Sequence, residues 1–134
     1  MRLMRFLTML LVMAATGSPV FAQSDDSFPV AVLGGLDKVA ARVSSFEAPV
    51  DQPVRFGTLE IVVRHCQMRP PEEPPETAAF LEITEARPDQ TPKTVFSGWM
   101  FASSPALSAL EHPVYDVWLI RCKTASGEAD GSSK

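Results

Sequence analysis

Three residues near the carboxyl end carry the side chains of a hydrolytic triad. Ser108, His112 and Asp116 follow one another at intervals of four residues. On a continuous helix this spacing would place a nucleophile, a base and an orienting acid on one face. Pro113 interrupts that helix, because proline lacks the N–H that the helical ladder needs, and the residues after it have the composition of a strand. The pattern therefore gives only weak support to a catalytic site.

A second group offers the soft and imidazole ligands that a copper carrier uses. It comprises His65, Cys66, Met68, Met100 and His112. In an extended strand His65 and Cys66 point to opposite faces, and Met100 lies between two aromatic residues, where a packing role accounts for it. Metal handling remains an alternative, and no cofactor is expected.

Aromatic residues form the third group. They are Phe96, Trp99, Phe101, Tyr115 and Trp118. Alternation along a strand puts Trp99 and Phe101 on one side, and Asp116 and Trp118 on one side of another strand. Exposed together, such rings would form a platform for a sugar, a peptide or a protein; buried, they would be core. We take Trp99, His112, Tyr115 and Asp116 as the candidate partner-binding surface.

The two cysteines each end a segment rich in β-branched and aromatic residues. Cys66 ends the segment that starts at Gly57, and Cys122 ends the one that starts at Val114. In an oxidising compartment two cysteines of a small domain usually pair. The sequence therefore predicts a Cys66–Cys122 disulfide that joins two strands, and closure of so long a loop contributes about 4 kcal/mol.

The amino-terminal 22 residues have the pattern of a cleaved signal peptide. Arg2 and Arg5 precede the apolar stretch Leu7–Ala15, which is too short to span a bilayer, and Val20-Phe21-Ala22 places small residues where a signal peptidase cuts. No cysteine follows the expected cut, so a lipid anchor is excluded, and no later segment is apolar enough to cross a membrane. We expect a protein of the bacterial periplasm or one that is secreted.

Alternating apolar and polar residues predict short strands along most of the remaining chain. The best examples are Gly57–Cys66, Ala78–Thr84, Lys93–Phe101 and Val114–Cys122. Residues 36–46 fit a helical face and a strand face alike; the preceding glycines favour a strand. Ser104-Pro105 predicts one short helical turn over Ala106–Glu111. The fold class is therefore all-β, a small antiparallel sandwich or barrel of about five to seven strands.

Length and composition set the domain organisation. The 134 residues hold one domain, and 46% hydrophobic residues argue against a disordered chain. We expect a signal peptide at 1–22, a flexible segment at 23–35, one β-domain at 36–123 and a disordered tail at 124–134. The net charge of −4 argues against nucleic acid as a partner.

Several longer strings resemble one bacterial family. They are Phe56-Gly-Thr-Leu-Glu-Ile61, Arg69-Pro-Pro-Glu-Glu-Pro-Pro75, Ala79-Phe-Leu-Glu-Ile83, Phe96-Ser-Gly-Trp-Met-Phe-Ala-Ser-Ser-Pro105 and His112-Pro-Val-Tyr-Asp-Val-Trp-Leu119. Together they resemble the domain of unknown function DUF2155, over roughly Leu36 to Cys122. The resemblance implies a secreted or periplasmic envelope protein of Gram-negative bacteria, and it carries no catalytic residues to transfer.

These observations favour a binding or assembly module of the cell envelope over an enzyme. Its partner would be an envelope protein or a glycan. A hydrolase of an envelope polymer that uses His112 and Asp116 is the first alternative, and copper handling is the second.

Overall fold

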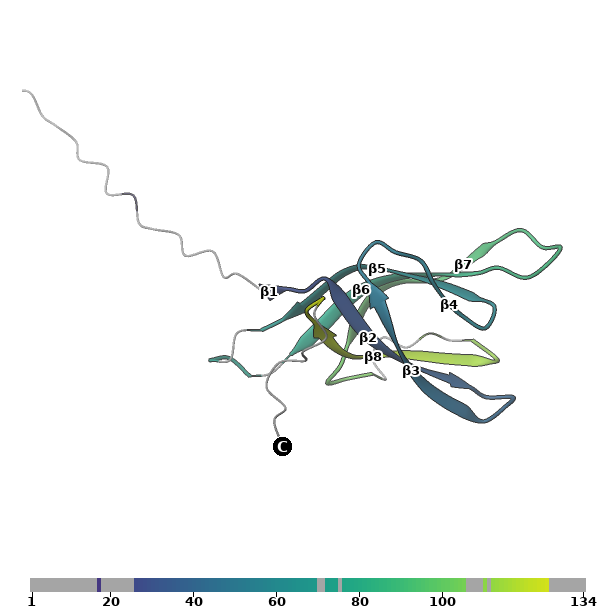
Figure 1. Cartoon of the computed structure of the whole chain (residues 1–134), viewed down its shortest axis with the longest axis horizontal. Helices are drawn as coiled ribbons and strands as arrows, with labels where there is room; N and C mark the ends of the chain where they lie inside the picture. Colours follow the sequence, from purple (N-terminus) through teal and green to yellow (C-terminus); the bar gives the residue numbers. More distant parts are fainter. Residues whose placement is uncertain are drawn as a thin grey trace, which may run out of the picture.

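A computed structural model shows two antiparallel sheets packed face to face (Figure 1). It describes residues 26–69, 72–74, 76–105, 110 and 112–125, together with Gly17. The strands within these residues are β1 (Asp26–Ser27), β2 (Val30–Asp37), β3 (Arg42–Pro49), β4 (Val54–Phe56), β5 (Leu59–Met68), β6 (Thr77–Glu85), β7 (Lys93–Phe101) and β8 (Tyr115–Lys123). The predicted all-β class is confirmed.

The large sheet has the strand order β1-β5-β6-β7, and β4 pairs with the same β5 further along its edge. The small sheet has the order β3-β2-β8. Strand β5 shows why these segments become strands: Leu59, Ile61 and Val63 are fully buried, and they alternate with the more exposed Glu60, Val62 and Arg64. Burial of one face stabilises the sheet, and the other face is left for solvent or a ligand.

The core lies between the two sheets. The large sheet contributes Leu81 and Met100, and the small sheet contributes Leu33 and Leu119, all within one buried cluster. Side chains from the inner faces of two packed sheets form such a layer in β-sandwiches. None of the described residues forms a helix of the length and hydropathy that a membrane crossing needs.

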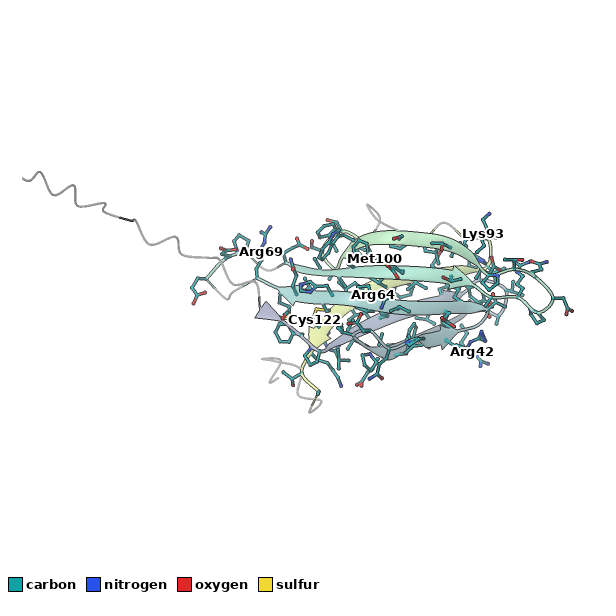
Figure 2. The ribbon with its side chains drawn as sticks, turned by 90° about the horizontal axis from the view of Figure 1, so that it is seen from above. Arg42, Arg64, Arg69, Lys93, Met100 and Cys122 are labelled. Carbon is teal, nitrogen blue, oxygen red and sulfur yellow. A yellow bond between two sulfur atoms is a disulfide. The ribbon has the colours of Figure 1, made fainter. Side chains whose placement is uncertain are left out.

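A disulfide joins the two sheets. Cys66 near the end of β5 and Cys122 near the end of β8 are bonded, with 5.9 Å between their Cα atoms. Both cysteines are buried at the edge of the core, and Cys122 is labelled in Figure 2. The predicted bond is therefore present, and it links the large sheet to the small one.

The boundary of the β-domain needs a correction. Residues 30–35, expected in a flexible segment, belong to β2, the central strand of the small sheet, and they are buried. The ambiguous residues 36–46 are neither one strand nor a helix, because β2 and β3 pair as a hairpin around the turn at 38–41.

Other expected segments fall outside the described residues. These are the signal peptide, described only at Gly17, and the helical turn at 106–111, described only at Leu110. The carboxyl-terminal tail is described only at residues 124 and 125.

Candidate functional site

A row of aromatic side chains crosses the outer face of the large sheet. His65 on β5 pairs with Phe80 on β6, and Phe80 pairs with Trp99 on β7. Their neighbours in sequence, Cys66, Ala79 and Met100, are buried in the core. Because side chains alternate along a strand, the three rings project away from the core. Figure 2 looks onto this face of β5, β6 and β7.

Trp99 is held in place by the other two rings. Its ring centroid lies 5.6 Å from that of Phe80 and 5.9 Å from that of His65, and the planes meet at 76° in both cases. Such edge-to-face contacts are favourable for aromatic pairs. Trp99 is nevertheless 40% exposed. The sheet therefore presents an indole whose orientation is fixed and whose surface is accessible.

Polar side chains flank the row. On one side His65 Nε2 lies 2.8 Å from Gln67 Oε1. On the other, Arg64 donates from Nε to Glu82 Oε2 and from Nη1 to Asp51 Oδ1, both at 3.1 Å. These two hydrogen bonds raise the pKa of Arg64 above its ordinary value. Arg64 therefore stays charged, and two carboxylates compensate its charge locally.

A groove continues from the row at His65. It has a volume of about 750 Å³ and is lined by the link from β1 to β2, by the end of β3 and by the turn after it. The lining includes Phe28, Glu47, Gln52 and His65. Sites for small molecules have volumes of this order.

His112 lies in a different environment, beside the end of β6. Its side chain is only 3% exposed. Nδ1 accepts hydrogen bonds from the backbone N–H groups of Val114, at 3.0 Å, and Tyr115, at 3.2 Å. Because Nδ1 is an acceptor, Nε2 carries the hydrogen of the neutral ring. Nε2 lies 3.2 Å from Glu85 Oε2 but is not aligned with it as a hydrogen bond.

Glu85 also contacts Arg87. The hydrogen bond from Arg87 Nε lowers the pKa of Glu85 below its ordinary 4.5; partial burial opposes this shift, and the contact with His112 adds to it. Glu85 therefore stays ionised at a lower pH than an ordinary glutamate does.

Tyr115 and Asp116 complete this region. The Tyr115 ring lies 5.3 Å from that of His112 and 5.4 Å from that of Phe56. Asp116 Oδ1 lies 2.9 Å from Lys38 Nζ, which also donates to the backbone oxygen of His112 at 3.0 Å. These contacts tie the start of β8 to the β2–β3 hairpin.

Comparison with known proteins places the chain in a family. The family model "Uncharacterized protein conserved in bacteria (DUF2155)" matches residues 31–122. The chain belongs to this family. The DUF2155 match spans all of the strands from β2 to β8 apart from the first residue of β2 and the last of β8.

The chain is also similar to a curated protein. It is an uncharacterized protein of Rickettsia prowazekii, 29% identical over 87 residues, which are 65% of this chain. The match covers 56% of that protein, so the chain spans little more than half of the relative's length. No solved structure matches the chain.

The structure separates the residues of the predicted partner-binding surface. His112, Tyr115 and Asp116 lie together at one end of this DUF2155 domain, with His112 beside Glu85. Trp99 pairs with Phe80, which is five residues from Glu85 along β6, or about 17 Å. His65 and Phe80, which contact Trp99, were not among the residues singled out for that surface. The alternation of β5 and β6 could have put them on an outer face, but only the strand register brings them to Trp99.

The residues of the two chemical alternatives have other contacts. Ser108 lies outside the described residues, and Asp116 contacts Lys38 rather than the His112 ring. Of the copper-ligand set, Cys66 is in the disulfide and Met100 is buried in the core. Within the described residues no three or more His, Cys, Asp or Glu side chains form a group that could hold a metal ion.

Proposed function

We propose that the chain is an exported, non-enzymatic binding or assembly module of the bacterial cell envelope. The observation that carries the binding role is Trp99, a large aromatic side chain that is held in one orientation by His65 and Phe80 and is 40% exposed. Large aromatic residues that stay accessible on a rigid surface are typical anchors of recognition sites.

The second tryptophan, Trp118, has a structural role that Trp99 does not share. Trp118 pairs with Gly34 across the small sheet, and a Cβ atom added at Gly34 would meet its indole at 2.2 Å. Trp118 therefore fills the space above a glycine, which is a structural role. Trp99, in contrast, is 40% exposed, and this surface is available for recognition.

Two further features support export and a non-catalytic role. The disulfide between the sheets suits an oxidising compartment, and the first 22 residues have the composition of a signal peptide. Both ring nitrogens of His112 face groups of the fold, and Asp116 is paired with Lys38. These residues hold the start of β8 in place.

Fractionation of the native bacterium tests the export. We expect the chain in the periplasmic or extracellular fraction, shortened at its amino terminus, with both cysteines protected from alkylation until a reductant is added. A full-length chain in the cytoplasm with two free thiols would contradict the proposal.

Photo-crosslinking in the same cells tests the binding role. A photoreactive amino acid at Ser97, which is exposed on β7 two residues before Trp99, should capture an envelope component. The matched control is Ser45, exposed on β3 of the small sheet, which should capture nothing specific. Equal products from both positions, or none from Ser97, would count against a binding surface at Trp99.

A further inference from the structure

We infer that the outer face of the large sheet binds a neutral glycan, with one pyranose ring stacked on Trp99. This inference rests on the proposed function and gives the chemical class of the ligand.

The indole has the properties of a stacking platform. The negative face of an aromatic ring attracts the slightly positive C–H groups of a pyranose, and a broad rigid ring does so at low entropic cost. Phe80 and His65 meet the Trp99 indole at 76° and fix its orientation before any ligand arrives. Such preorganisation removes part of the cost of binding.

Side chains that can hydrogen-bond to sugar hydroxyls lie two residues along the strands on either side of the aromatic row. Glu82 and Ser97 pair with each other next to the Phe80–Trp99 pair, and Gln67 lies two residues from His65 on the other side. A carboxylate accepts hydrogen bonds from the hydroxyls of a stacked sugar, and hydroxyl and amide groups both donate and accept them. A pyranose is bound by apolar contact with one face of its ring and by hydrogen bonds to the hydroxyls at its edge.

The local charge favours a neutral ligand over an acidic one. The cation beside the platform, Arg64, is hydrogen-bonded to Asp51 and Glu82, so it has no excess positive charge to offer. The whole chain carries a formal charge of −4, which adds repulsion toward a polyanion.

The same face fits a protein partner poorly. Stable protein interfaces bury about 800 Å² on each partner around an apolar centre that is depleted in charge. Among the described residues of this face, Trp99 is the exposed large hydrophobic, and the charged Arg64 network lies close to it. One aromatic platform in polar surroundings matches a sugar better than a protein.

The groove provides room for more than one sugar unit. It starts at His65, which contacts Trp99, and passes Phe28, Glu47 and Gln52. Another aromatic ring and further polar groups therefore follow the platform. The ligand class is an oligosaccharide or polysaccharide rather than a free monosaccharide.

Single-tryptophan variants of the full, oxidised chain provide the test. The chain has two tryptophans, so in Trp118→Phe all tryptophan emission comes from Trp99, and in Trp99→Phe it comes from Trp118. Each is titrated with cellotetraose, maltotetraose and tetra-N-acetylchitotetraose, and with tetragalacturonic acid as the acidic control. Circular dichroism checks that each variant is folded.

At least one neutral tetrasaccharide should change the emission of the Trp118→Phe variant in a saturable way and leave that of Trp99→Phe unchanged. By calorimetry, Trp99→Ala should lower the affinity at least about tenfold, whereas Trp118→Phe should keep it within about twofold. The acidic tetramer should bind at least about tenfold more weakly.

Three results would overturn the inference: no saturable binding of any neutral tetrasaccharide at millimolar concentration, equal affinity in folded Trp99→Ala, or tighter binding of the acidic tetramer. If a protein were crosslinked at Ser97 and no saccharide bound, the glycan inference would fail and the proposed function would stand. Saccharide binding by a chain found in the cytoplasm would overturn the proposed export and leave the site intact.

Discussion

Glu85 links the stability of the fold to pH. Its pKa is lowered in the folded state, mainly by the hydrogen bond from Arg87, so the ionised form is favoured by folding. The resulting stabilisation is complete above the unfolded-state pKa and is lost as the pH falls through the folded-state pKa. We therefore expect Glu85→Gln to lower the urea midpoint at pH 7, and the gap to the native chain to shrink as the pH falls below the ordinary glutamate pKa of 4.5. A gap of constant size from pH 7 to about pH 3 would contradict this role for Glu85.

Position 57 requires glycine, because of its backbone conformation and because the Tyr115 side chain lies so close to it. Its φ of +59° lies in the left-handed region, and an added Cβ would come within 2.2 Å of the Tyr115 hydroxyl oxygen. We expect Gly57→Ala to lower the free energy of unfolding by about 3 kcal/mol, through backbone strain and overpacking. The control is Gly98→Ala, whose Cβ would meet nothing nearer than 3.7 Å and should cost less than about 1 kcal/mol. Equal losses in urea denaturation would refute the argument.

At the residue scale the sequence predicted one member of the aromatic row. Alternation along β7 put Trp99 on one side of a strand, and the structure shows it on the outer face. His65 and Phe80 join it only through pairing of three strands, with a register shift between Val63 and His65. That register depends on contacts across the whole sheet. His112 likewise contacts Glu85, which is distant from it in sequence.

At the element scale, β2 was the strand that alternation could not identify. Val30, Ala31, Val32 and Leu33 are all buried, so the strand shows no polar face. A strand covered on both faces gives a continuous apolar run, which is harder to assign than an alternating one. The two glycines that follow, under Trp118 and Phe56, belong to the same strand.

The turn between β2 and β3 also lacked a clear signal. Asp37 Oδ1 accepts hydrogen bonds from the N–H groups of Val39 and Ala40, and Ala41 adopts a φ of 51°. Glycine or asparagine usually occupies such a position, and an alanine there conceals the turn. Ala41→Gly should therefore raise the free energy of unfolding by about 1 kcal/mol. Ala40→Gly is the matched control and should be neutral or slightly destabilising. Thermal unfolding of both variants distinguishes them, and no gain from Ala41→Gly would contradict the proposed strain.

At the scale of the whole molecule, two sheets of unequal size share one core. The small sheet buries Leu33 and Leu119 against Leu81 and Met100 of the large one. Alternation predicted a sandwich or a barrel, since strands with one apolar face must pack against one another. It could not give the division into a large and a small sheet, because that depends on β2 pairing with β8 from the other end of the chain.

The disulfide is the covalent link between these sheets, at residues 56 positions apart. Reduction of the disulfide increases the conformational entropy of the unfolded chain. The free energy of unfolding should therefore be about 4 kcal/mol larger for the oxidised protein than for the reduced one. That is a large share of the 5–15 kcal/mol that stabilises a typical domain. Urea denaturation of the same chain with and without a reductant measures the difference without removing atoms from the core. The Cys66→Ala/Cys122→Ala variant is the control, because it should be as unstable as the reduced chain or more so, and insensitive to reductant. If the oxidised and reduced proteins unfolded at the same urea concentration, the sheets would be held by packing alone, and folding would not depend on an oxidising compartment.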